Sequence, residues 1–218
     1  MKPAGEPARG WAEGFPPVEP RRARTLILGT LPSAESIRQG QYYAHPRNAF
    51  WPIMGALFGA GRDRPYPARL RKLAAHGVIL WDVLRAAHRP GSLDSAIHPR
   101  RLEPNAITEL LARHPELERI AFNGAPAEAL FRRHVARKCG ARLAALELVR
   151  LPSTSPAHAA RTFAQKLAAW RKMLGAPARP AAAGTEPHRL LANRPSRMET
   201  TTITDSRKLR RGRRRSPG

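Results

Sequence analysis

Two polar segments hold most of the residues whose types and spacing can do chemistry. The first opens at Gly29 and reaches two adjacent tyrosines and then Asn48. The second contains Ser153, Thr154 and Ser155 between two prolines. Side-chain amides and hydroxyls orient polar ligands through hydrogen bonds. Serine and threonine hydroxyls on a rigid turn can donate hydrogen bonds to phosphate oxygens. Such contacts do not depend on the base sequence.

Each of these residues also has a purely structural interpretation. Asn48 stands where a helix is expected to begin, so its side chain can cap that helix instead of facing a ligand. Tyr42 and Tyr43 offer a flat face for stacking, but half-buried packing explains them equally well. The serine-rich segment can be a simple Ser-Pro turn. From the residues alone, both interpretations stay open.

The signatures of common cofactors and metals are missing. The chain has neither Gly-x-Gly-x-x-Gly nor Gly-Lys-Ser/Thr, and its eight histidines show no metal-ligand spacing. Cys139 is alone and cannot form a disulfide within the chain or supply a cluster. We therefore expect no cofactor and no metal. Serine catalysis through Ser33 or Ser153 is the conventional alternative, although neither lies in Gly-x-Ser-x-Gly.

The charge is strongly positive. The 218 residues include 39 Lys and Arg against 16 Asp and Glu, a net charge of +23, and the segment before residue 176 keeps +15 of it. Such an excess attracts polyanions, because displacing phosphate counterions is favourable. Since Arg outnumbers Lys 33 to 6, a bias in base composition is the alternative explanation.

Alternating apolar runs predict the elements that must position these residues. We expect strands at 25–28, 78–81, 119–122 and 147–151, with helices at 49–57, 67–76, 105–113, 127–138 and 161–174. This order is typical of a three-layer α/β/α fold around a central, mostly parallel four-stranded sheet. In such sheets, sites form in the loops at the carboxyl ends of the strands.

The ends of the chain differ in composition from its middle. Residues 1–22 hold five prolines and no apolar periodicity, and predict a flexible arm. Residues 23–175 predict one folded domain, and 176–218 a disordered basic tail. No run of about 18 apolar residues and no apolar leader occur. We therefore expect a monomer without membrane contact in the cytoplasm, associated with the nucleoid in a bacterium.

Six segments, in order and suitably spaced, resemble the uracil-DNA glycosylase superfamily and, within it, the hypoxanthine (deoxyinosine) DNA glycosylase branch. The resemblance extends from about residue 24 to residue 174. The segments are Gly29-Thr30-Leu31-Pro32-Ser33, the run from Tyr42 to Trp51 that contains His45-Pro46-Arg47-Asn48, Leu80-Trp81-Asp82-Val83, Gly91-Ser92-Leu93-Asp94-Ser95, Phe122-Asn123-Gly124, and Leu151-Pro152-Ser153-Thr154-Ser155-Pro156.

The resemblance implies an enzyme that works without metal on damaged DNA. Its substrate would be duplex DNA, and the resemblance does not decide whether single strands are also accepted. The enzyme would flip a deaminated base, hypoxanthine or also uracil, into a pocket and hydrolyse its N-glycosidic bond. Asn48 takes the catalytic role, Tyr43 stacks on the base, and Asp82 accepts the ring N–H that adenine lacks. The other implied base contacts are Gly29, Thr30, Phe50 and Asn123, and the implied DNA contacts are Ser33, Arg47, Ser153, Thr154, Ser155, Pro156 and His158.

The chain departs from the superfamily pattern at three positions. Leu31 replaces the Asp or Asn that many members carry, and Leu151 replaces the usual His or Asn; leucine cannot orient water. His158 stands where Asn is more usual in the branch. A non-catalytic α/β module that binds nucleic acid and retains the scaffold is the alternative function. The structural interpretation of Asp82 is the capping of a helix or turn, and that of Asn123 is packing of the third strand.

Overall fold

A four-stranded parallel sheet forms the centre of the molecule. The computed structural model describes residues 10–175. Strands β2 (Thr25–Gly29), β3 (Val78–Asp82), β6 (Arg119–Asn123) and β7 (Glu147–Leu151) pair in the order β3-β2-β6-β7, every pair parallel. The three-layer α/β/α fold with a parallel four-stranded sheet is thus confirmed.

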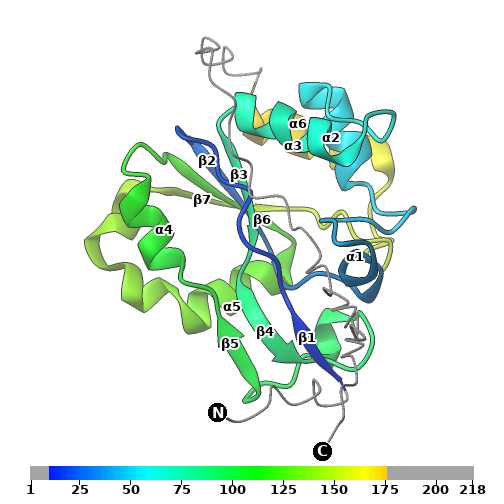
Figure 1. The fold of residues 1–218 in the computed structure, drawn as a ribbon. Coiled ribbons are helices and arrows are strands. Elements are labelled where there is room, and N and C mark those ends of the chain that lie inside the picture. Colours follow the sequence, from blue (N-terminus) through cyan, green and yellow to red (C-terminus); the bar gives the residue numbers. More distant parts are fainter. Residues whose placement is uncertain (1–9, 176–218) are drawn as a thin grey trace, which may run out of the picture.

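Helices cover both faces of this sheet, which explains why its strands are apolar runs without alternation. Helices α2 (Phe50–Phe58), α3 (Tyr66–Ala75) and α6 (Phe163–Leu174) gather on one side, and α4 (Ile107–Arg113) and α5 (Ala125–His134) on the other (Figure 1). Leu26, Ile27 and Leu28 of the central strand are completely buried. Phe50 packs edge-on against Trp51 and Trp170 on the first side.

Two helical segments differ from the expected ones. Helix α1 (Ala34–Gln39) lies inside the long first loop, where no helix is expected. The single helix expected over 127–138 is instead α5 followed by the 3-10 segment η2 (Ala136–Ala145), because Val135 leaves the helical conformation at φ −121°. Among residues 10–175, no helix combines the length and the apolar character that a membrane span requires.

A second sheet corrects the expectation of a flexible arm over 1–22. Strand β1 (Trp11–Glu13) pairs antiparallel with β4 (Leu84–His88), which also pairs with β5 (Leu102–Pro104). Val18 bridges to Leu80, so residues 10–22 are part of the fold. A three-residue edge strand shows no periodicity, because its position depends on pairing with distant residues. Residues 1–9 of the arm and the tail over 176–218 lie outside the described residues.

Candidate active site

A cavity of about 790 Å³ opens at the carboxyl ends of the parallel strands. Loops from β2, β3, β6 and β7 meet there, as expected for a sheet of this topology. This volume falls within the usual range of small-molecule sites. Predicted residues of the site line it: Gly29, Thr30, Ser33, Tyr43, Asn48, Asp82, Asn123, Ser153, Thr154, Ser155 and His158.

The side chain of Asn48 lines the cavity and also binds the start of helix α2. Its Oδ1 accepts a hydrogen bond from the Phe50 N–H at 3.0 Å. Ala49, the residue directly before the helix, provides no side-chain cap. The two interpretations of Asn48 therefore coexist. Because Oδ1 is committed to the helix, the NH₂ group is left to donate to a ligand, and no partner for it occurs among residues 10–175.

Several contacts hold the loop that leads to Asn48. The Tyr42 N–H donates to the Tyr66 hydroxyl at 3.0 Å, and the Trp51 Nε1–H donates to the Tyr42 carbonyl at 2.8 Å. The Ala49 N–H donates to the Thr154 carbonyl at 3.0 Å. This last bond joins the first loop to the loop that follows β7, so the two polar segments form one wall of the site.

Tyr43 has a strained backbone, with φ at +53°. A non-glycine residue in this region costs on the order of 1–3 kcal/mol and is typical of functional sites. Its ring stacks on Phe50 with centroids 4.0 Å apart and planes at 22°. The expectation that Phe50 contacts a base is wrong in this geometry. Phe50 is fully buried, is not among the residues that line the cavity, and supports Tyr43 from behind.

Gly29 is the last residue of strand β2, and the side chains of Asp82 and Tyr43 lie close to its backbone. A Cβ at this position would lie 2.3 Å from Asp82 Oδ1 and 2.9 Å from the Tyr43 hydroxyl. Only a residue without a side chain fits there. The missing side chain of Gly29 therefore leaves room for the Asp82 carboxyl group and the Tyr43 hydroxyl next to the end of β2.

Two carboxyl groups line the cavity, Asp82, which is buried, and Asp94, which is half-buried. Burial, with a smaller contribution from Asp94, raises the pKa of Asp82 from 3.8 to about 8. Asp82 Oδ2 is buried and has no hydrogen-bond partner among residues 10–175. At neutral pH Asp82 is thus mostly a neutral acid, which both donates and accepts a hydrogen bond. Such a group pairs with a ligand edge that places an N–H beside a carbonyl.

Asp94, on the loop after β4, is a residue that sequence reasoning did not assign. It lines the cavity, and the Thr30 hydroxyl donates to its Oδ1 at 2.6 Å. Burial raises the pKa of Asp94, while the Thr30 bond and the nearby Arg89 oppose this shift. The only indication in the sequence that Asp94 belongs to the site is its position in segment 91–95, which is one of the six segments of the family resemblance. Arg89 is buried and also donates to the carbonyls of Leu31 and Pro32.

Asn123 and Thr154 bind each other. The Asn123 NH₂ donates to the Thr154 hydroxyl at 2.9 Å, and the Thr154 N–H donates to Asn123 Oδ1 at 2.8 Å. This pair ties the end of β6 to the loop after β7. Asn123 lies at the cavity as expected, but its amide is engaged by the protein, so its main task is to fix the loop.

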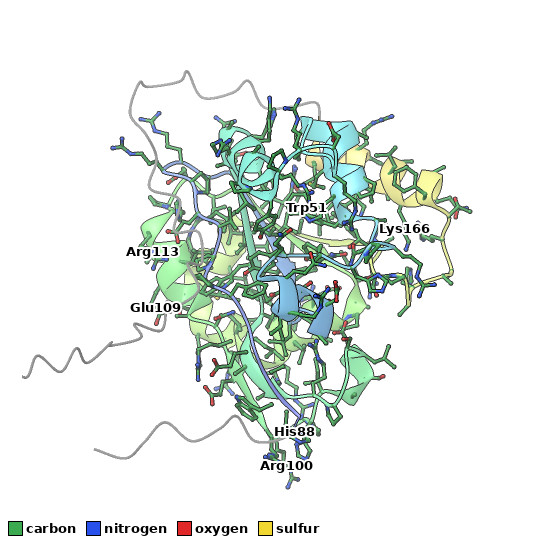
Figure 2. The ribbon with its side chains drawn as sticks, turned by 45° about the vertical axis from the view of Figure 1, so that its right-hand side comes forward. Trp51, His88, Arg100, Glu109, Arg113 and Lys166 are labelled. Carbon is green, nitrogen blue, oxygen red and sulfur yellow. The ribbon has the colours of Figure 1, made fainter. Side chains whose placement is uncertain are left out.

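Side chains of helix α6 hold the serine-rich loop by donating hydrogen bonds to the backbone carbonyls of that loop. Lys166 is buried, and its Nζ donates to the His158 carbonyl at 2.9 Å and the Ser155 carbonyl at 3.4 Å. The Trp170 Nε1–H donates to the Pro152 carbonyl at 3.0 Å. Figure 2 shows Lys166 on the side of the molecule formed by α2 and α6, away from His88 and Arg100. Nothing in the sequence pattern indicates this role of Lys166.

The remaining predicted residues take peripheral or structural places. Ser33 caps helix α1, accepting from the Ser36 N–H, and Ser153 accepts from the Ser155 N–H. Neither hydroxyl contacts a histidine within 10–175, so the geometry gives no support to serine catalysis. Arg47 and Pro156 are exposed and do not line the cavity. Three basic residues that the sequence analysis did not assign do line it: Arg150, Arg161 and Lys172.

Comparisons with known proteins agree on one family. A family model described as the uracil DNA glycosylase superfamily matches residues 16–174. Two proteins named hypoxanthine DNA glycosylase, from Methanosarcina acetivorans and Methanosarcina barkeri, are 42% and 39% identical over 51% of this chain and 70% of theirs. A solution structure of a candidate uracil DNA glycosylase from Methanosarcina acetivorans matches at 35% identity and TM-score 0.61, over 75% of this chain and 96% of that one.

The buried acid predicts a pH-dependent stability. An unfolded Asp82 has a pKa near 3.8 and the folded one near 8, so folding takes up a proton between these values. Stability therefore falls as the pH rises through this window. Asn cannot ionise, so Asp82→Asn is expected to raise the thermal midpoint relative to wild type. The gain should grow from about pH 4 to about pH 8 and then level off.

Thermal unfolding across this pH range checks the prediction. Glu13→Gln, which removes an exposed carboxylate from β1, is the matched control and should change little. A gain from Asp82→Asn that is the same at every pH would contradict the assignment of a buried neutral acid.

Proposed function

Because the chain belongs to the uracil DNA glycosylase superfamily, we propose that it removes deaminated bases from DNA, hypoxanthine above all and uracil as a second substrate. One observation carries this proposal: Asn48, whose NH₂ has no partner among residues 10–175, and Asp82, whose buried Oδ2 has none there either, line the same cavity. The names of the two Methanosarcina relatives support hypoxanthine as the base. We expect the protein to act as a monomer on duplex DNA.

Reaching the bond requires the nucleotide to leave the duplex. Extrusion costs a few kcal/mol, and least for a poorly paired base, which gives part of the selectivity. The ring of Tyr43, backed by Phe50, then offers a rigid face for the base to stack on. The neutral Asp82 pairs with the adjacent N–H and carbonyl that hypoxanthine and uracil share.

Bond cleavage places positive charge on the sugar and negative charge on the departing base. The Asn48 NH₂ stabilises that negative charge by donating a hydrogen bond as it develops. An amide is not a base, and Leu31 at the wall of the cavity cannot orient water. An oxocarbenium-like centre accepts neutral water, so neither limitation prevents hydrolysis.

Base release is the direct test. The protein is incubated in EDTA with labelled duplexes that contain deoxyinosine, deoxyuridine, deoxyxanthosine or a thymine mismatch, and abasic sites are then cleaved with alkali. We expect strand scission at deoxyinosine first, and only after alkali, because a monofunctional enzyme leaves the strand intact. Tight binding without release from any duplex would favour the non-catalytic module.

Substitutions at Asn48 separate its two tasks. Aspartate caps helices as well as asparagine does but has no NH₂ group. Asn48→Asp should therefore keep the thermal midpoint while base release under single-turnover conditions falls by about 100-fold or more. Asn48→Ala should lose this activity and also about 1 kcal/mol of stability from the lost cap. Activity retained in Asn48→Asp would contradict the role given to the NH₂ group.

Basic residues on the wall between β7 and α6 predict where the DNA backbone lies. Arg161 and Lys172 line the cavity with exposed side chains. Arg161→Ala should weaken binding to damaged and undamaged duplexes equally and lower the slope of log affinity against log salt by about 1. Arg133→Ala, exposed at the far end of α5, is the control. An equal effect of both substitutions on binding would contradict this path.

A further inference from the structure

The guanidinium group of Arg62 donates hydrogen bonds to several backbone carbonyls of the loop that carries Tyr43 and Asn48. Arg62 Nη2 donates to the carbonyls of His45 at 2.7 Å and of Tyr43 and Asn48 at 3.3 Å each. Its Nη1 donates to the Ala44 carbonyl at 3.4 Å. Four carbonyls within six residues thus face a single cation.

The surroundings of Arg62 fix it in this place. It lies on the turn between α2 and α3, and Arg69 Nη2 donates to its backbone carbonyl at 3.1 Å. Arg69 in turn lies over the Trp51 ring, 5.4 Å from its centroid. No carboxylate among residues 10–175 pairs with the Arg62 guanidinium. Its charge is therefore balanced by the carbonyl dipoles of the loop, through charge-assisted hydrogen bonds that are stronger than neutral ones.

We propose that Arg62 is a positioning residue that holds the Asn48 side chain toward the cavity and keeps Tyr43 in its strained conformation. The inference rests on the proposed function, because positioning matters only if Asn48 acts on a ligand. The His45 carbonyl that receives the shortest Arg62 bond also accepts the Asn48 N–H at 2.9 Å. Arg62 therefore fixes the turn from which the Asn48 side chain projects.

Removing the guanidinium takes away one donor from each of the four carbonyls, and only the His45 carbonyl keeps the Asn48 N–H that it already accepts. The loop then relaxes toward conformations in which Tyr43 is unstrained and Asn48 is displaced. A displacement of about 1 Å near the reacting atoms can lower the rate by about 100-fold. Contacts with the DNA backbone are made by other residues, so affinity should change far less than the rate.

The test compares Arg62→Ala and Arg62→Lys with Arg64→Ala, a matched control whose exposed side chain lies two residues away on the same turn. Each variant is measured for thermal midpoint, affinity for deoxyinosine duplex, and single-turnover base release with and without millimolar guanidinium. The side-chain NH₂ resonance of Asn48, identified by its loss in Asn48→Asp, reports the position of the amide.

We expect base release by Arg62→Ala to fall by about 100-fold with affinity within about threefold of wild type. Guanidinium should restore part of this rate, and Arg62→Lys, which keeps the charge but not the fork, should be intermediate. The Asn48 resonance should shift in both variants and not in Arg64→Ala. A merely structural role would lower stability without rescue by guanidinium and without a selective change at Asn48.

Near-wild-type rates with an unshifted Asn48 resonance in Arg62→Lys would overturn the proposal, even if Arg62→Ala fails to fold. Failure of guanidinium to restore activity to a folded Arg62→Ala would do the same. If the wild-type protein releases no base from any duplex, the proposed function fails. The Asn48 resonance still decides whether Arg62 positions the amide, so the two failures are distinguishable.

Discussion

The bond from the Phe50 N–H to Asn48 Oδ1 determines what the site can do. It satisfies a free amide at the start of helix α2 and at the same time sets which end of the carboxamide is available to a ligand. The available end is a hydrogen-bond donor. A donor at this position suits a leaving group that gains negative charge, which is why we propose that Asn48 acts on the departing base.

Three cations hold the loops at the cavity by their backbone carbonyls. Arg62 and Arg89 bind two separate segments of the first loop, and Lys166 binds the loop after β7. Each cation thus fixes the backbone of a segment that lines or supports the cavity through charge-assisted hydrogen bonds. The burial that raises the pKa of Asp82 opposes folding at neutral pH, which is typical of residues kept for function.

The parallel sheet could be predicted from the sequence because its strands are buried on both faces and appear as unbroken apolar runs. Strand β1 could not, since three residues on a sheet edge have no pattern of their own. The meeting of Asn48, Tyr43 and Asp82 followed from the rule that sites lie beyond the carboxyl ends of such strands. The roles of Arg62 and Lys166 depend on hydrogen bonds to backbone carbonyls in other parts of the chain, and an arginine-rich sequence does not show which cations make them. Phe50 was misplaced because a stacking aromatic and its support look alike in sequence.

The most direct measurement of the central claim is a structure of the protein with a duplex that carries 2′-fluoro-deoxyinosine, in which the electron-withdrawing fluorine slows cleavage. We expect hypoxanthine inside the cavity, stacked on Tyr43, with the Asn48 NH₂ within hydrogen-bond distance of the base. Hypoxanthine stacked in an undisturbed duplex, with Asn48 contacting only Phe50, would contradict the proposed role of Asn48.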